Sequence, residues 1–372
     1  MSDTSIKPKN KFILWGKAAG RCEYEGCNQP LWLDLLTKVE LNTSYIAHII
    51  ADKSTGPRGD SVLSEKLKND ISNLMLLCDV HHRLIDVEDI SGHSVERLRG
   101  MKRDHEERID ILTSIMPEKR SHILLYGANI GKHNAKVSWI EAALAMTPDR
   151  YPARREAFEL GLTNNTFQDN EEKYWRLERE NLQRQFDQKV KPNLQLGNVG
   201  HFSIFAFAPQ PLLIELGRLL SDIPAADVYQ LHREPKQNWN WQESPVSFDY
   251  IIKKPNSDHS KVAIILSLSA TIDEKRITDV VGEDVSIWTV TVDNPNNDFL
   301  KSREQLVKFR ELLRKLFDEI KAKHGHGNVL HVFPAVPVAI AVEIGRVWMP
   351  KADLPLLIYD ENRGFSLVLT ID

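Results

Sequence analysis

The chain contains three cysteines, and all three lie where a single metal site would need them. Four residues separate Cys22 from Cys27, and two residues separate Cys78 from His81. Two closely spaced pairs of soft ligands, separated by a long intervening segment, are typical of a tetrahedral zinc site. We therefore expect a structural Zn²⁺ held by Cys22, Cys27, Cys78 and His81, whose binding contributes folding free energy. Unpaired buried cysteines are the alternative interpretation.

Composition narrows the class of protein further. Zinc would use every cysteine, which leaves none for disulfides and indicates a reducing compartment. The net charge of −4 means that a DNA-binding surface would have to come from local clustering of basic residues. The polar, lysine-bearing start at Met1–Lys11 has no signal-peptide core, and no run approaches the ~18 apolar residues of a membrane span. We expect a cytoplasmic protein without a membrane partner.

The length of 372 residues predicts two or three domains. We place one domain at 1–118 and a second at 119–372. In the first, Ser94 is the expected N-cap of a helix over 94–115, and a short helix is expected at 81–87. In the second, strands alternate with helices, which predicts an α/β fold with a largely parallel sheet. The expected strands are 122–126, 202–208, 228–232, 262–268, 285–292, 329–333, 356–359 and 365–371, and the expected helices are 137–146, 170–189, 211–220 and 300–324.

A weak internal repeat runs through the second domain. Phe205–Pro209 leads into Glu215-Leu216-Gly217-Arg218, and Val332–Pro334 leads into Glu343-Ile344-Gly345-Arg346. Each copy reads as a strand, a proline turn and a helix, followed by another strand. The repeat predicts a duplicated Rossmann-like unit, which would bind ligand beyond the carboxyl ends of its strands. Chance similarity between two ordinary strand–helix–strand pieces is the alternative.

Three polar residues in the first domain suggest hydrolysis. His48 lies in an apolar strand over 46–50, a polar glycine-containing loop follows, and Asn73 and His82 come later. A histidine that titrates near neutrality can take a proton from water and make it a nucleophile. A divalent cation beside it can neutralise the charge that develops on a phosphate. A purely structural histidine is the alternative.

Residues 20–88 resemble the HNH, or ββα-metal, endonucleases in Cys22, Cys27, Ala47-His48-Ile49, Asn73 and Leu77–His82. The resemblance implies an α+β zinc domain in which His48 is the general base and Asn73 orients the loop and the base. It implies that His82 binds a catalytic Mg²⁺ or similar ion, while His81 is the structural zinc ligand. Many members have an aspartate where this chain has Ala47. The catalytic ion would then be held by fewer protein groups, or by a residue that the sequence does not identify.

Basic and aromatic residues in the second domain suggest a nucleotide ligand. Arg233 stands at a strand end, and Trp239 and Trp241 follow it, which offers phosphate pairing and base stacking. The second repeat contributes Arg346 and Lys351 near the equivalent place. The alternative is that the tryptophans pack on a loop and the basic side chains are solvated.

The strings 231–241, 291–297, 331–339 and 343–351 resemble the SAVED domain, a fusion of two CARF-like Rossmann halves, most clearly from residue 198. The resemblance implies a sensor of cyclic di- or trinucleotides in bacterial anti-phage signalling (CBASS). An HNH domain fused to it would be the effector nuclease, which degrades double-stranded DNA. The resemblance also implies a homo-oligomer that grows by head-to-tail assembly when ligand binds.

Two other functions fit the same residues. One is an HNH restriction-type nuclease whose C-terminal half reads modified DNA and needs no small ligand. The other is a binding protein whose zinc knuckle has lost catalysis, which Ala47 favours.

Overall fold

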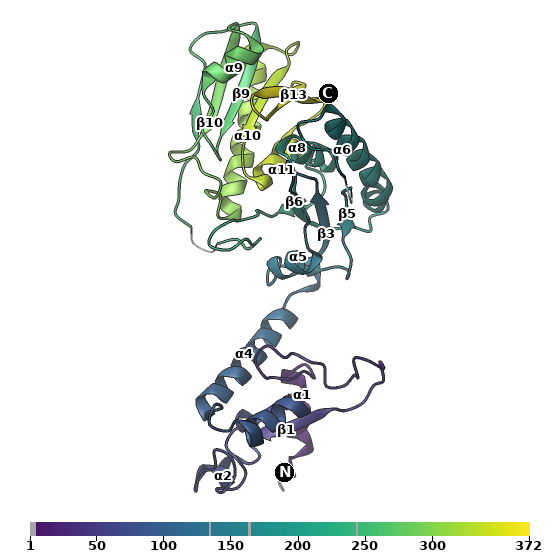
Figure 1. The fold of residues 1–372 in the computed structure, drawn as a ribbon, viewed down its shortest axis with the longest axis vertical. Coiled ribbons are helices and arrows are strands. Elements are labelled where there is room, and N and C mark those ends of the chain that lie inside the picture. The colour runs from purple at the N-terminus through teal and green to yellow at the C-terminus, as the bar shows by residue number, and fades with distance from the viewer. Residues whose placement is uncertain (1–4, 134, 163–164, 243–244) are drawn as a thin grey trace. The chain divides into compact units, whose positions relative to one another are not determined.

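The computed structural model describes residues 5–133, 135–162, 165–242 and 245–372. The chain divides into two compact units, Met1–Met116 and Pro117–Asp372, which are described separately (Figure 1). Within the described ranges, no helix is long and apolar enough to cross a membrane.

The first unit is built on an antiparallel hairpin. Strands β1 (Ser44–His48) and β2 (Leu74–Cys78) pair with Ser44 opposite Cys78 and His48 opposite Leu74. Helix α3 (Asp79–Arg83) follows β2 directly and continues as a π-helical turn over Leu84–Glu88. All five residues of β2 are buried, so this strand is the centre of the unit's core. The remaining helices are α1 (Pro8–Lys17), α2 (Leu63–Leu67), a 3₁₀ turn at Ile71–Asn73 and α4 (Val95–Thr113).

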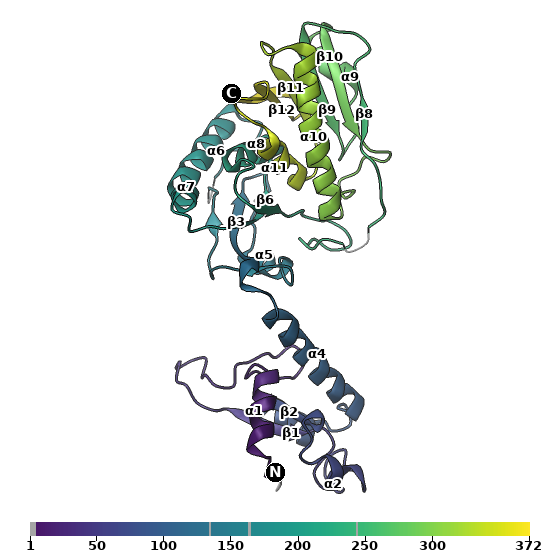
Figure 2. The same ribbon diagram turned by 180° about the vertical axis from the view of Figure 1, so that it is seen from behind.

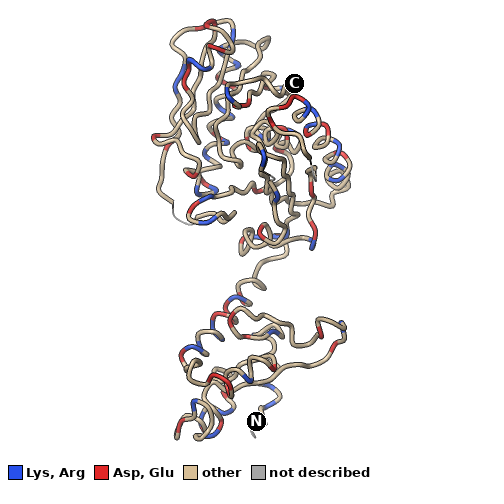
Figure 3. The backbone as a smooth tube through the Cα atoms, in the orientation of Figure 1, with Lys and Arg blue, Asp and Glu red and all other residues tan. Residues whose placement is uncertain are grey.

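Two sequence predictions for this unit are confirmed. The Ser94 side chain accepts a hydrogen bond from the Arg97 backbone N–H and so caps α4. The short helix expected at 81–87 exists, although it begins two residues earlier and ends in the π-helical turn. Both basic and acidic residues occur along α4, as Figure 3 shows, so this helix carries mixed charge.

The second unit contains two sheets, one from each half. In the first half the strand order is β4-β3-β6-β7, with β5 also on β3, and every pairing is parallel. Its strands are β3 (Arg120–Gly127), β4 (Tyr151–Pro152), β5 (Phe158–Glu159), β6 (Phe202–Phe207) and β7 (Ala226–Val228). Its helices are α5 (Trp139–Ala145), α6 (Glu172–Gln185), which continues through Phe186–Val190 into α7 (Lys191–Gln195), and α8 (Gln210–Leu220).

The second half has the order β13-β12-β11-β9-β10-β8, with four central parallel strands and two antiparallel edges. Its strands are β8 (Ile251–Lys253), β9 (Lys261–Ser267), β10 (Val285–Thr291), β11 (Leu330–Ala335), β12 (Leu356–Glu361) and β13 (Phe365–Ile371). Its helices are α9 (Glu274–Val281), α10 (Arg303–His324) and α11 (Val338–Val347). The predicted α/β class is confirmed, and the two sheets agree with the duplicated unit that the internal repeat predicts.

Most predicted elements lie within a few residues of the observed ones, and one does not. The strand expected at 228–232 ends at Val228, and Tyr229–His232 leaves the sheet. The sequence analysis missed α1, α2, α7, α9 and the short strands β4, β5 and β8. Strand β8 is three residues long with two of them exposed, and α9 buries only Ile277 and Val281. A three-residue strand is too short to show a periodic pattern, whereas α9 does carry a helical one in Ile277, Val280 and Val281.

Each sheet has an outer and an inner face. Alternate residues of β9 divide between two clusters: Ala263 and Ile265 face α9, while Val262 and Ile264 join the main core with α10 and α11. The first sheet does the same, with α5 on its outer face and α6 and α8 on its inner face. Figures 1 and 2 show α9 and α10 on opposite sides of the second sheet. The two halves therefore share one inner core.

Helices α8 and α11 cross at the centre of that core, where the repeat places a glycine on each. A Cβ at Gly217 would lie 1.9 Å from the Val342 carbonyl oxygen, and a Cβ at Gly345 would lie 1.9 Å from that of Ile214. Glycine is needed at both positions because the two backbones touch. Each helix also carries the repeat's ion pair, Glu215 with Arg218 and Glu343 with Arg346.

We expect Gly217→Ala to destabilise the second unit by about 1–3 kcal/mol, because the new methyl group meets backbone rather than a movable side chain. Gly200→Ala is the matched control, since nothing lies within 4 Å of a Cβ there. Urea unfolding of the full chain measures both. Equal stability of the two variants would contradict the close crossing.

Candidate functional site

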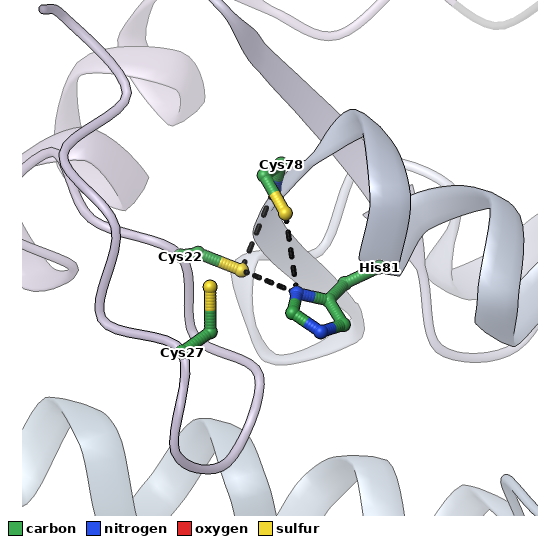
Figure 4. A group of neighbouring side chains, drawn as sticks. All are labelled: Cys22, Cys27, Cys78 and His81. Atoms are coloured by element: carbon green, nitrogen blue, oxygen red, sulfur yellow. Dashed lines mark hydrogen bonds between the residues drawn. The ribbon is translucent and has the colours of Figure 1, made fainter. Parts of the chain in front are cut away.

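The four predicted zinc ligands come together in the first unit (Figure 4). One donor atom from each of Cys22, Cys27, Cys78 and His81 lies within 4.8 Å of the others. His81 Nδ1 lies 3.1 Å from Cys78 Sγ and 3.6 Å from Cys22 Sγ. With metal–ligand bonds of about 2.0–2.3 Å in a tetrahedron, donor atoms are expected roughly 3.5–3.8 Å apart. The spacing of this donor set fits zinc.

Two segments bring these ligands together. The loop between Cys22 and Cys27 turns through Gly26, whose φ of +77° is left-handed. Cys78 is both the last residue of β2 and the N-cap of α3, so His81 lies one helical turn above it. Burial raises the pKa of the Cys22 thiol well above its ordinary value, and the neighbouring Cys78 and Cys27 sulfurs add to this rise. A cation is what allows such buried sulfurs to be thiolates.

A stacked tyrosine fixes the orientation of His81. The Tyr24 ring lies parallel to the His81 ring at 4.0 Å between centroids. The Tyr24 hydroxyl lies 3.0 Å from Nε2 of the buried His93, whose Nδ1 lies 2.6 Å from the Asp89 carbonyl oxygen. Burial lowers the pKa of His81, which favours the neutral imidazole that a metal requires.

His48 and Asn73 are tied to the same stretch of backbone. Asn73 Nδ2 donates to the Ile50 carbonyl at 2.8 Å, and its Oδ1 accepts from the Ile50 N–H at 2.8 Å. His48 Nε2 donates to the Lys68 carbonyl oxygen at 2.9 Å. Because Nε2 carries the proton in that bond, Nδ1 of the neutral ring is the basic nitrogen. Asn73 thus holds the chain that leaves β1 just after His48.

His82 lies apart from the zinc ligands. Its ring stacks on Tyr45 at 5.0 Å, and its Nε2 lies 3.5 Å from Asp86 Oδ2. Asp86 Oδ1 in turn lies 2.5 Å from Nη2 of Arg58, a residue of the glycine-containing loop. Sequence reasoning missed both Arg58 and Asp86. The four-residue step from His82 to Asp86, one turn of helix, is the signal that could have found the second.

In each half of the second unit, the strand order of the sheet reverses between two central parallel strands. Strand β3 lies between β4 and β6, and β9 lies between β10 and β11, so the strand order reverses at β3/β6 and at β9/β11. Ligands of doubly wound sheets bind beyond the carboxyl ends of the strands at such points. A pocket of about 230 Å³ lies there between the halves. Its lining includes Ile130, Phe207–Gln210, Arg233, Ser269, Val336–Val338 and Asp360.

Two helices begin at this pocket, α8 at Gln210 and α11 at Val338. The positive end of the helix dipole favours anions at a helix N-terminus, although in these first turns Pro211 has no N–H and the Leu212 N–H already donates to the Pro209 carbonyl. Gln210 Oε1 accepts from Val336 N–H at 3.2 Å, and Gln230 Oε1 accepts from Ala339 N–H at 3.1 Å. These two bonds join the halves across the pocket.

The pocket also contains acidic groups. Burial, with a smaller contribution from the nearby Asp169 and Glu361, raises the pKa of Asp360 to about 7. A carboxyl group with this pKa is partly protonated at neutral pH. The pocket is therefore less negative than its three carboxyl groups suggest, which leaves the helix N-termini able to attract an anion.

The structure does not bring the five predicted nucleotide-binding residues together. Arg233 is exposed and lines the pocket. Trp239 is buried against Phe205 in the core behind the first sheet, and the half-buried Trp241 packs edge-on against His232. A side chain in that core cannot stack on a base unless the loop after β7 rearranges.

Arg346 and Lys351 belong to the other end of α11. Arg346 is 2% exposed and is bonded to Glu343 and to the Ser221 and Pro224 carbonyl oxygens. Lys351 follows the C-terminus of α11, while the N-terminus of that helix lines the pocket. Ten residues of helix span roughly 15 Å, so neither residue belongs with Arg233. The repeat placed Arg346 correctly on a helix, but its role there is to pack against the first half.

One further cluster has the residue types of a hydrolytic triad, but its serine is inaccessible to a substrate. Ser121 Oγ lies 2.8 Å from His201 Nδ1, and His201 Nε2 lies 3.6 Å from Asp227 Oδ2. Ser121 is completely buried, and burial lowers the pKa of His201 to about 4. A hydroxyl that no substrate can reach is a strand-end contact rather than a nucleophile.

Two doubly wound halves that share a core and a pocket at their carboxyl edge define an α/β ligand-binding domain. Residues 182–371, more than half of the chain, match the SAVED family, described as the SMODS-associated and fused to various effectors sensor domain. The chain therefore belongs to the SAVED family. No curated protein matches it.

Solved structures of Cap4 SAVED/CARF-domain containing receptors also match. The Acinetobacter baumannii receptor with 2'3'3'-cAAA is 11% identical with a TM-score of 0.40, over 74% of this chain and 55% of that one. The same receptor with 3'3'3'-cAAA is 10% identical with a TM-score of 0.42, over 84% of this chain and 67% of that one. The Moraxella osloensis receptor is 11% identical with a TM-score of 0.39, over 75% and 57%. The chain thus spans little more than half the length of the first of these proteins.

We expect His81→Gln to lose zinc and to unfold the first unit, because a closed structural site supplies folding free energy. His82→Gln is the matched control, since the neighbouring histidine lies outside the cluster. Elemental analysis and thermal melting of the purified full-length variants decide the matter. One equivalent of tightly held zinc in His81→Gln, or its loss in His82→Gln, would contradict the assignment.

Proposed function

We propose that this chain is a cyclic-oligonucleotide-activated, metal-dependent endonuclease that degrades double-stranded DNA in anti-phage defence. The observation that carries the proposal is a fusion within one chain. A SAVED sensor domain is joined to a strand–strand–helix unit with a Cys₃His set, and that unit holds His48, Asn73 and His82.

The proposed chemistry assigns one task to each residue. His48 Nδ1 takes a proton from a water molecule as the water oxygen attacks a DNA phosphorus. The bond from phosphorus to the leaving deoxyribose oxygen breaks, and that oxygen takes up a proton from solvent water. Asn73 keeps the His48 backbone in place through its paired bonds to Ile50. A divalent cation bound at His82 would supply charge neutralisation for the phosphate.

The structural zinc has a separate task in this proposal. Cys22, Cys27, Cys78 and His81 would hold it, and it would join the loop before the hairpin to the start of α3. The β1–β2 hairpin is only five residues long on each side, and two-stranded hairpins are marginally stable in water. Zinc would therefore fix the position of His82 on α3 relative to His48 on β1.

The pocket between the two halves of the second unit supports the proposal of a nucleotide ligand. Two helices begin at the pocket with the positive ends of their dipoles there, and Arg233 adds a positive charge at its edge. At about 230 Å³ the pocket holds only part of a cyclic trinucleotide, so we expect the loop after β7 to move when ligand binds. Assembly of several chains on ligand binding would then bring nuclease units together to cut both strands.

The test is plasmid DNA incubated with the full chain and Mg²⁺, with and without a panel of cyclic di- and trinucleotides. The cyclic trinucleotides seen with the Cap4 receptors are the first to include. We expect cleavage only with the matching nucleotide, together with an increase in size by light scattering. Equal cleavage without any nucleotide would favour the restriction-type alternative, and no cleavage under any condition would favour the binding module.

We expect His48→Ala to lower the rate of plasmid cleavage by about 10²–10⁴-fold, because a general base contributes that much. Zinc content and nucleotide affinity should stay at the wild-type level, since His48 is neither a zinc donor nor part of the sensor unit. Cleavage by the mutant at the wild-type rate would remove His48 from the mechanism.

We expect Arg233→Ala to weaken cyclic-nucleotide binding by about tenfold or more, which is typical for the loss of one charged hydrogen bond. Lys351→Ala is the control, because it removes an equal charge at the opposite end of α11. Calorimetric titration of both variants measures the difference. The reverse order of effects would place the ligand elsewhere on the unit.

A further inference from the structure

The first unit contains one carboxylate directed at His82. His82 Nε2 and Asp86 Oδ2 are 3.5 Å apart, a separation too long for a strong hydrogen bond. Two ligands of one small divalent cation, with bonds of about 2.1 Å at angles of about 90–110°, are expected roughly 3.0–3.4 Å apart. The side chains of His82 and Asp86 are 22% and 24% exposed, so a cation with its water ligands can reach them.

Arg58 fixes the position of Asp86. The Arg58 side chain is only 6% exposed, and its Nη2 lies 2.5 Å from Asp86 Oδ1. Its Nε donates to the Ile49 carbonyl at 2.8 Å, and its Nη1 donates to the Ile85 carbonyl at 2.7 Å. Arg58 therefore joins the end of β1 to the turn that carries Asp86. It engages one oxygen of that carboxylate and leaves the other toward His82.

Strand β1 shows why a carboxylate is needed here. The His82 ring stacks on Tyr45, so His82 lies over the face of β1 that carries Tyr45. Ala47 is two residues further along and shares that face, because side chains alternate along a strand. Ala47 offers no ligand atom. Asp86 reaches the same histidine from the helical side.

Resting on the proposed function, we propose that Asp86 and His82 together bind the catalytic divalent cation, with Asp86 in place of a carboxylate at Ala47 and Arg58 as its positioning residue. The ligand class is a hard divalent cation such as Mg²⁺ or Mn²⁺, for which a carboxylate oxygen is the preferred protein ligand. The Cys₃His set is a separate, softer site that would keep zinc.

The test is titration of the zinc-loaded full chain with Mn²⁺, with free Mn²⁺ counted by electron paramagnetic resonance. We expect Asp86→Asn to weaken Mn²⁺ binding by about 10–100-fold or more, since even outer-shell changes cost that much. Glu88→Gln is the matched control, because this neighbouring exposed carboxylate pairs with Arg83 instead. Wild-type Mn²⁺ affinity in Asp86→Asn, with zinc retained, would overturn the proposal.

A second measurement covers the case in which Asp86→Asn fails to fold after losing its pair with Arg58. Fe²⁺ bound to the wild-type chain cuts nearby backbone when ascorbate and peroxide are added. We expect cuts near Ala47 and His82–Asp86, and their loss in His82→Gln. Cuts confined to other parts of the chain would overturn the proposal.

These readouts separate the two claims. If Mn²⁺ binding depends on Asp86 but no cyclic nucleotide induces DNA cleavage, the cation site stands and the proposed function fails. If cleavage occurs while Mn²⁺ binding is unaffected by Asp86→Asn, the function stands and the cation site fails.

Discussion

The close crossing of α8 and α11 determines the arrangement of the second unit. Gly217 and Gly345 let each helix backbone touch a carbonyl of the other, so the two halves share a single core. Because each helix starts at the carboxyl edge of its own sheet, the same crossing places both helix N-termini beside one pocket. A larger residue at either glycine would separate the helices and widen the pocket together. The packing of the two halves and the shape of the pocket therefore depend on the same contact.

The sequence predicted those parts of this arrangement that depend on residues close together in the chain. Strand–helix alternation gave the α/β class, and the repeated Glu-aliphatic-Gly-Arg string marked the two equivalent helices. The function of that string could not be predicted, because Gly217 and Gly345 act on each other across a long stretch of chain. Arg346 was expected near a ligand phosphate, since arginine is common at such sites. Its burial against Glu343 depends on the first half covering it, which no local pattern encodes.

The first unit shows the same division. The cysteine spacing predicted which four residues come together, because two of the ligands of a zinc site are close in sequence in each of its two pairs. The predicted role of Asn73 has a matching contact in its paired bonds to Ile50. Arg58 could not be predicted, because its pairing with Asp86 joins a loop to a turn 28 residues later in the chain, whereas the four-residue step from His82 to Asp86 is a local pattern that could have been read.

Ion pairs with a buried partner occur in both units. Comparing Glu215 with Asp86 shows which carboxylate has an oxygen open to a cation. Both oxygens of Glu215 are occupied by Arg218, with Gln183 adding a third bond. A carboxylate so enclosed has no lone pair directed outward, and its bonds join α8 to Gln183 on α6. Arg58 occupies one oxygen of Asp86 and leaves the second beside the partly exposed imidazole of His82. An anchored carboxylate with one oxygen open toward a histidine is preorganised for a cation, because little side-chain freedom remains to be lost on binding.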